Sequence, residues 1–231
     1  MLDVVLRYIP LVRAVKKLNI KNKTIVEIGG SGEGIGFYLP NYKIIDCDIS
    51  FVKNILPNVK PLINKNSTLP LPSNYSDIVV STDMLEHLPT NHQRENMIKE
   101  MIRVAKKEVV LGVPVGSDSL NAIKIFGVWF KKRWPKLKNQ YVTEHIKFGQ
   151  PSEKDILQMI KNSNYKAKVL IQKNTNIKLW LLFQKFYLKF PKLYLIFRYR
   201  RFWYFILGPF YFLFNHGKTM RNIFLINLDK N

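Results

Sequence analysis

The sequence predicts an α/β fold with a mostly parallel sheet, and two observations support that prediction. Short β-branched runs alternate along the first half of the chain with segments whose apolar residues recur at helical spacing. A turn with five glycines, "VEIGGSGEGIG" (residues 26–36), directly follows the first of these runs. Strands that alternate with helices form βαβ units, so the sheet should be parallel with right-handed crossovers.

The expected elements can be placed in order along the chain. The N-terminal segment, residues 2–19, predicts a helix with a kink or break at Pro10. A short helix should follow the glycine turn over residues 35–40, and a longer one should cover residues 91–105. Strands are expected over residues 23–29, 42–50 (ending at Asp46 or Asp48), 59–63, 77–85, 107–115, 166–173 and 221–228.

Composition limits the class of protein. A chain of 231 residues with 47% hydrophobic residues can bury one substantial core, so we expect a single domain over residues 1–231. Its one cysteine, Cys47, excludes a disulfide framework. The four histidines show no metal-ligand spacing, and we expect no metal. Charges interrupt the apolar N-terminal run, so no cleavable signal peptide is evident and a cytoplasmic location is expected.

The glycine turn does not match the common phosphate-binding patterns. No placement of Gly-x-Gly-x-x-Gly fits residues 26–36, and no Gly-Lys-Ser/Thr follows, which excludes a P-loop. Glu27 stands just before the glycines, where a carboxylate would repel a pyrophosphate but suit a cation. The turn therefore indicates a ligand with positive charge that approaches the backbone closely.

Three motifs in order resemble the class I S-adenosylmethionine-dependent methyltransferases, over roughly residues 20–116. They are "VEIGGSGEG", "DCDIS" about twenty residues later, and "LPLPSNYSDIVVSTDMLEHLP" around the expected fourth strand. The resemblance implies a Rossmann-like fold with a seven-stranded sheet, helices on both faces and an antiparallel pair of last strands. It also implies S-adenosyl-L-methionine as the cofactor and methyl transfer as the activity.

The resemblance also implies the residues that hold the cofactor. Either Asp46 or Asp48 would bind the ribose hydroxyls. Lys65 or Asn66 stands where relatives often carry an acid that contacts adenine, and Asn66 could accept that hydrogen bond through its amide oxygen. The glycines are shifted, since Ser31 and Glu33 occupy two positions that are usually glycine. The full set of expected cofactor-binding residues is Glu27, Gly29, Gly30, Ser31, Gly32, Gly34, Asp46, Asp48, Asn66, Asp83, Met84 and Leu85.

Two histidines are candidate catalytic residues. His87 follows the fourth strand near the expected position of the transferred methyl group, and His145 lies in residues 117–150, a segment expected to shape the acceptor pocket. A base is needed only for a hydroxyl or a protonated amine. The competing interpretation is that Glu86 and His87 orient the loop and bind the methionine end of the cofactor, and that His145 only packs in a loop.

The second half of the chain explains much of the formal charge of +21. Residues 157–228 contain thirteen Lys and Arg but no Asp or Glu, and residues 180–214 contain sixteen aromatic residues. This helical insertion, residues 174–220, separates the last two expected strands. Lys178, Lys185, Lys189 and Lys192 share one helical face, a pattern typical of helices in a membrane interface. The alternatives are a helical cap over the core or an oligomer interface.

These observations predict methyl transfer to a small-molecule, lipid or lipid-linked glycan acceptor at an anionic membrane surface. The longest uncharged apolar run, residues 202–214, is too short to span a bilayer, which favours shallow insertion. A basic cluster at residues 130–138 favours an anionic acceptor. Methylation of RNA or DNA through the basic surface is a less favoured alternative, and a non-catalytic methyltransferase-like scaffold is another.

Overall fold

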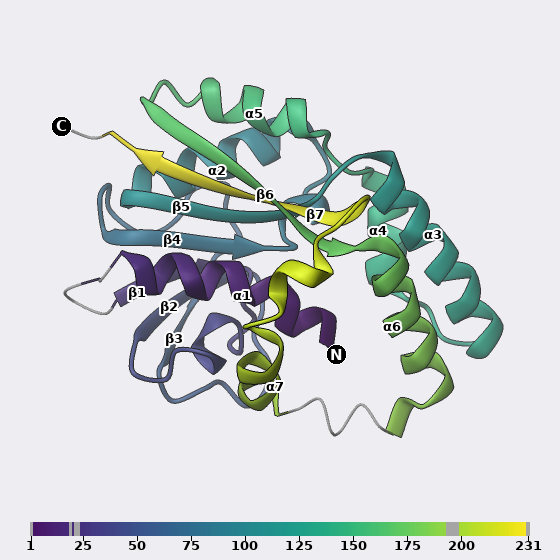
Figure 1. Ribbon diagram of the computed structural model, residues 1–231. Helices are drawn as coiled ribbons and strands as arrows, with labels where there is room; N and C mark the ends of the chain where they lie inside the picture. The colour runs from purple at the N-terminus through teal and green to yellow at the C-terminus, as the bar shows by residue number, and fades with distance from the viewer. Residues whose placement is uncertain (1, 19, 21–23, 193–198, 230–231) are drawn as a thin grey trace.

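A computed structural model describes residues 2–18, 20, 24–192 and 199–229, and its centre is one seven-stranded sheet (Figure 1). The strand order is β3-β2-β1-β4-β5-β7-β6. Neighbouring strands from β3 to β5 pair in parallel, whereas β7 is antiparallel to both β5 and β6. The strands are β1 (Thr24–Ile28), β2 (Lys43–Asp48), β3 (Val59–Ile63), β4 (Ser76–Thr82), β5 (Ala105–Pro114), β6 (Ala167–Asn176) and β7 (Thr219–Leu228).

Helices cover both faces of this sheet. On one face α1 packs against the sheet and forms one hydrophobic core with it. On the other face α2 and α5 pack over β4, β5 and β7 and form a second core. Figure 1 shows α3, α4 and α6 together beyond the carboxyl ends of the parallel strands. The helices are α1 (Leu2–Lys17), α2 (Asn91–Val104), α3 (Gly116–Arg133), α4 (Gln140–Phe148), α5 (Glu153–Lys161), α6 (Ile177–Lys189) and α7 (Arg200–Leu207), with 3-10 turns η1 (Ile35–Phe37), η2 (Leu85–His87) and η4 (Tyr211–Phe214).

The architecture confirms the predicted Rossmann-like fold. The strands lie close to their expected positions. Their Val and Ile residues point to both faces of the sheet and fill the cores on either side. Along β4, for example, every residue but one is buried. The pairing of β6 with β7 runs from Ala167 opposite Leu228 to Asn176 opposite Thr219, which is the expected antiparallel closure.

The structure decides one alternative and corrects one prediction. Of the kink or break expected at Pro10, the break is excluded, since α1 continues through this residue to Lys17. The helix expected over residues 35–40 is only the three-residue turn η1. Pro40 explains this difference, because a proline disfavours helical conformation at the residue before it and cannot donate a backbone hydrogen bond.

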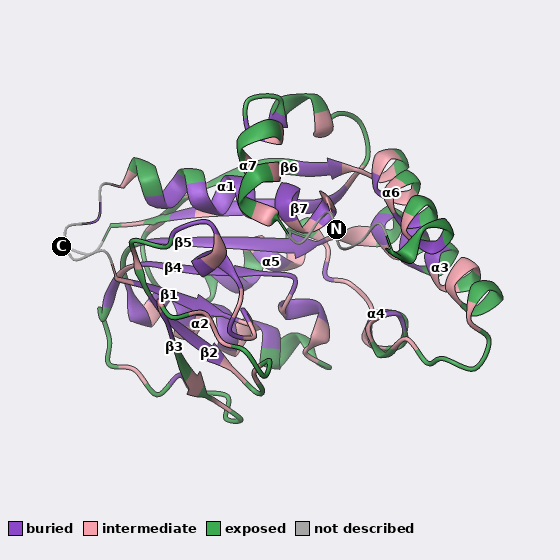
Figure 2. Ribbon diagram, turned by 90° about the horizontal axis from the view of Figure 1, so that it is seen from below, coloured by how far each residue is buried: buried purple, intermediate pink, exposed green. Residues whose placement is uncertain are grey.

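The insertion between β6 and β7 is divided between two packing surfaces. Helix α6 buries Trp180, Gln184 and Leu188 toward α3, and its three lysines, Lys178, Lys185 and Lys189, are exposed. Lys192 is also exposed but lies beyond the end of this helix. Helix α7 instead packs against α1 and has no buried residue of its own (Figure 2). None of the helices in the described part of the chain is long and apolar enough to cross a membrane.

Candidate functional site

The glycine turn is built around the side chain of Glu27, the fourth residue of β1. The carboxylate accepts hydrogen bonds from the backbone N–H of Ile35, at 3.0 Å to Oε1 and 2.8 Å to Oε2. The Tyr8 hydroxyl of α1 donates a third hydrogen bond, at 3.1 Å. Glu27 is 1% exposed, so it holds the two ends of the turn together from inside the protein rather than facing a ligand directly.

Two glycines of the turn are required by the acidic side chains beneath them. A Cβ on Gly30 would lie 2.7 Å from both Asp46 Oδ2 and Glu27 Oε2. A Cβ on Gly34 would also collide with the Glu27 carboxylate. The close approach that the sequence indicated is therefore, at these two positions, an approach of the backbone to the protein's own carboxylates.

Asp46 and Asp48 of β2 both point toward the turn, as the strand alternation suggested, but they differ in burial. Asp46 is fully buried and accepts from the backbone N–H groups of Gly30, at 3.0 Å, and Gly32, at 2.7 Å. Asp48 is half-buried, and its Oδ2 accepts from both the N–H and the hydroxyl of Ser31, each at 3.0 Å. Of the two acids, only Asp48 has a carboxylate that a ribose could reach.

The buried acids beneath the turn resist ionisation. Burial raises the pKa of Glu27, and the neighbouring Asp46 carboxylate raises it further, against the hydrogen bonds from Ile35 and Tyr8. Burial also raises the pKa of Asp46, although the N–H groups of Gly32 and Gly30 partly offset this. Glu27 and Asp46 are register partners on adjacent strands, so ionising one disfavours ionising the other.

The carboxyl end of β4 supplies the second side of the site. Met84 lies over Gly29, where an added Cβ would be 3.1 Å from Met84 Cβ and Cγ. Gly29 has a φ of +82° and is half-buried, so its main chain is partly accessible although the Met84 side chain lies against it. Leu85 is fully buried in the core below. Asn66 is exposed in the β3–β4 loop, where its N–H bonds to Asn64.

Asp83 has a role that the sequence did not indicate. Its carboxylate binds Arg221 of β7, at 2.6 and 2.8 Å, and Arg7 of α1, at 2.8 Å. Burial alone would raise the pKa of Asp83, but the two guanidinium groups outweigh it and hold that pKa well below its usual range. Arg221 also binds Asp3. Asp83 therefore fixes the end of β4 to α1 and β7 and is not available to a ligand.

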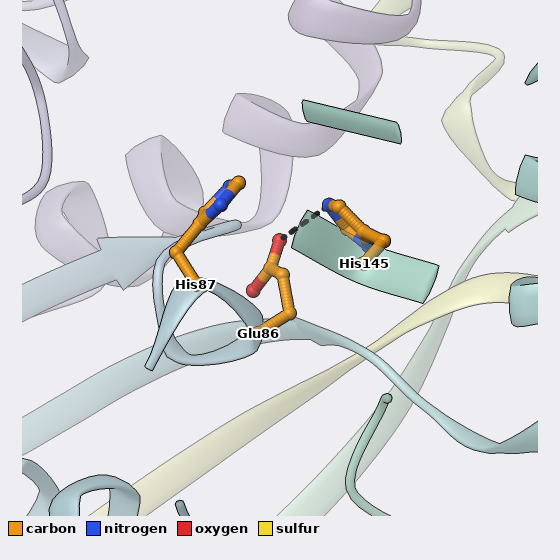
Figure 3. Close-up of side chains that lie close together, drawn as sticks. All are labelled: Glu86, His87 and His145. Atoms are coloured by element: carbon orange, nitrogen blue, oxygen red, sulfur yellow. Dashed lines mark ion pairs between the residues drawn. The ribbon is translucent and has the colours of Figure 1, made fainter. Parts of the chain in front are cut away.

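His87 and His145, far apart in the sequence, are brought together beside Glu86 (Figure 3). The two imidazole rings are 5.2 Å apart, and the Tyr141 ring lies 4.2 Å from that of His145. His87 Nδ1 is 2.6 Å from Glu144 Oε2, and His145 Nε2 is 3.8 Å from Glu86 Oε1. Burial, together with His87, lowers the pKa of His145 to about 4, so its imidazole is neutral at pH 7.

The fit of this site to an S-adenosyl donor can be judged from its chemistry. Gly29 is half-buried and carries no side chain of its own, which allows a ligand to approach its main chain closely. The half-buried Asp48 carboxylate is a suitable acceptor for a vicinal diol. Together these groups fit the donor, which when bound supplies an already activated methyl group. The chain's own residues then have to orient this methyl group toward an acceptor.

Comparison with known proteins agrees with this geometry. Residues 30–112, from the glycine turn through β5, match a family described as a methyltransferase domain. No curated protein matches the chain.

Solved structures of methyltransferases share the fold. A putative methyltransferase from Bacillus halodurans C-125 is 12% identical, with a TM-score of 0.52 and coverage of 96% of this chain and 99% of that one. Magnesium protoporphyrin IX methyltransferase from Synechocystis, with bound S-adenosylhomocysteine, is also 12% identical, with a TM-score of 0.52. The match covers 96% of this chain and 82% of that one.

A third similar structure is phosphoethanolamine N-methyltransferase 2 from Haemonchus contortus, in complex with phosphomonomethylethanolamine and S-adenosylhomocysteine. It is 13% identical with a TM-score of 0.57, and the match covers 95% of this chain but 52% of that one. At these identities the structural likeness shows the fold. The chain therefore has the fold of the class I S-adenosylmethionine-dependent methyltransferases, and its residues 30–112 match a methyltransferase domain, for which S-adenosylmethionine is the methyl donor.

Proposed function

We propose that this methyltransferase acts on an amphiphilic, anionic acceptor, a lipid or lipid-linked glycan, at a membrane surface. The observation that carries the proposal is a group of exposed apolar side chains on and around α7 and η4, here called the aromatic patch. Soluble proteins rarely expose so many large apolar residues together. The patch consists of Tyr199 (73% exposed), Phe202 (58%), Phe205 (65%), Ile206 (41%), Phe210 (54%), Phe212 (62%) and Leu213 (53%).

The charge of the surrounding segment favours lipid over a protein partner as the occupant of this patch. Residues 157–228 contain no acidic residue, and a surface of anionic headgroups complements their exposed basic residues, which do not include the buried Arg221. Each basic residue near such a surface contributes about 1 kcal/mol. Aromatic residues are also the ones that prefer the interface between water and lipid. A few basic contacts and the aromatic patch together would hold the protein at the bilayer.

The aromatic patch is physically continuous with the methyl-donor turn. Arg200, at the start of α7, forms an ion pair of 2.7 Å with Glu33 of the turn, and its guanidinium lies 5.0 Å from the Phe37 ring. Tyr204 of α7 lies 5.7 Å from Tyr38, which stacks at 5.3 Å on the tyrosine that binds Glu27. Membrane contact through α7 would therefore bring the donor turn close to the bilayer, where an amphiphilic acceptor resides.

Liposome flotation tests the proposal. The protein should float with vesicles that contain about one-third phosphatidylserine or phosphatidylglycerol, and much less with neutral vesicles. A variant with Phe202→Ser, Phe205→Ser and Phe212→Ser should lose most of this binding. Val128→Ser, at an exposed apolar position of α3 (68% exposed), is the matched control and should float like the wild type. Unchanged flotation of the triple variant would contradict the proposal.

Nucleic acid is the competing acceptor, because the exposed basic residues 131–133, 136 and 138 would suit phosphates. A labelled-methyl transfer assay on separate lipid, glycan and RNA extracts distinguishes the two. Label in the lipid or glycan fraction supports the membrane proposal. Label confined to RNA, with binding that weakens steeply as salt rises, would replace it. Donor binding in calorimetry with no transfer to any fraction would favour the scaffold.

A further inference from the structure

Glu86 and His145 form a buried polar contact that the protein itself does not satisfy. Both side chains are completely buried, and neither Glu86 oxygen nor His145 Nε2 has a hydrogen-bond partner among the residues that the structure describes. Their 3.8 Å separation is too long for a hydrogen bond between them. Leaving such groups unpaired in the interior costs about 1–3 kcal/mol each, and more for a charged group. An arrangement of this kind indicates a missing positive partner between them.

His87 completes the arrangement from the solvent side. One ligand atom each from Glu86, His87 and His145 lies within 4.8 Å of the other two. Figure 3 shows Glu86 between the two imidazoles, with its carboxylate directed to His145. We propose that Glu86, His87 and His145 together bind a divalent first-row transition-metal ion. Two imidazoles and one carboxylate are a ligand set that such ions prefer, and three protein ligands leave a position open.

The groups behind the two histidines suit metal binding. Glu144 lies 2.6 Å from His87 Nδ1, so a proton held there leaves Nε2 free for an ion. The Gln150 amide nitrogen faces His145 Nδ1 at 3.3 Å, and its oxygen accepts from the Ser119 hydroxyl. With this amide turned over, its oxygen would accept the Nδ1 proton. His145 Nε2 would then present its lone pair toward Glu86. Both imidazoles can thus be held as neutral ligands.

The position of this cluster gives the ion a role in the proposed reaction. Glu86 and His87 lie in η2, directly after Met84, which contacts Gly29 of the donor turn. His87 is half-buried, so the open coordination position would face the accessible side. An acceptor with an oxygen atom could bind there, which would lower the pKa of a hydroxyl and orient it. This role rests on the proposed function, whereas metal binding itself does not.

Zinc titration of chelator-treated protein tests the metal site. Calorimetry should show one Zn²⁺ per chain, and saturating Zn²⁺ should raise the melting temperature. Glu86→Gln and His145→Gln should each weaken binding at least about tenfold and abolish the thermal shift. His92→Gln and His216→Gln remove exposed histidines outside the cluster and should change neither result. His87→Gln, at a half-buried position, provides the same test if a buried variant fails to fold.

X-ray absorption at the zinc edge supplies a readout independent of catalysis. The proposal expects only nitrogen and oxygen neighbours, at about 2.0–2.2 Å. Absence of zinc binding, binding that the His92 or His216 variant removes, equal affinity in the cluster variants, or a sulfur neighbour from Cys47 would each overturn the site. None of these outcomes touches the flotation result, so failure of the metal site and failure of the membrane proposal can be told apart.

Discussion

Arg221 of β7 binds Asp83, at the end of β4, through two hydrogen bonds of 2.6 and 2.8 Å, and the same guanidinium binds Asp3 of α1. Arg221 is 1% exposed and Asp83 is 9% exposed. This buried network ties the last strand and the first helix to the loop that carries Met84. The site therefore depends on contacts between the two ends of the chain.

Breaking this network should strongly destabilise the protein. Asp83→Asn removes the negative charge that Arg221 and Arg7 bind in the interior. Removal of one partner of a buried ion pair lowers the free energy of unfolding by about 3–5 kcal/mol. Urea unfolding followed by circular dichroism measures the loss. Asp118→Asn breaks the exposed Lys218–Asp118 pair and is the matched control, with an expected loss below about 1 kcal/mol. Similar small losses in both variants would contradict the role of the network.

Asp83 should also make stability depend on acidity. Its pKa in the folded protein is held below the ordinary value, so the ionised form contributes stability above the unfolded pKa of about 3.9. That contribution is lost as the pH falls below about 4, because the unfolded chain then binds a proton that the folded one does not. The free energy of unfolding measured between about pH 2 and 6 should fall less steeply in Asp83→Asn. Equal slopes in the two proteins would argue against the ion pairs.

Glu27 and Asp46 should give the opposite dependence. Their pKa values are raised in the folded protein, so their contribution is complete below about pH 4 and is lost as the pH rises. Glu27→Gln keeps an oxygen for the Ile35 N–H but carries no charge. Its free energy of unfolding should therefore decline less than that of the wild type between about pH 4.5 and 8. A variant that loses stability just as steeply would show that the pair ionises freely.

The fold could be predicted from the sequence because each strand is marked by a local pattern of residues. The β-branched runs indicate the strands, the glycine turn indicates the first strand-to-helix connection, and the spacing of the three motifs indicates the order of the elements. Turn η1 differed from expectation because propensity alone does not weigh one proline against tertiary packing. The metal expectation relied on local histidine spacing, whereas His145 of the proposed cluster lies 58 positions after His87.

The Arg221 network escaped prediction for a related reason. Its hydrogen bonds join residues 138 and 218 positions apart, and no local pattern records such a pairing. Asp83, which follows β4, was expected to bind the cofactor, but its carboxylate instead accepts hydrogen bonds from Arg7 of α1 and Arg221 of β7. An arginine near the start of a predicted strand rich in Ile, Leu and Phe was the signal that could have revealed it.

Ser31 and Asp48 offer a direct test of how the donor is held. The Ser31 hydroxyl occupies Asp48 Oδ2, the oxygen that a ribose hydroxyl of the donor would need. Ser31→Ala removes this competitor and keeps a Cβ, so the backbone at φ +55° is strained to the same extent. Affinity for S-adenosylmethionine, measured by calorimetry, should rise by roughly two- to tenfold, because the ribose hydroxyl no longer has to displace the serine hydroxyl from this oxygen.

The matching variants complete this test. Asp48→Asn should weaken donor binding by at least about tenfold, because a hydrogen bond to a charged acceptor is lost. Ser50→Ala, a nearby serine whose side chain makes no such contact, should bind like the wild type. If Ser31→Ala weakens binding, the hydroxyl contacts the donor itself rather than competing with it. If Asp48→Asn binds normally, the diol is held elsewhere, and the buried Asp46 would have to open toward it.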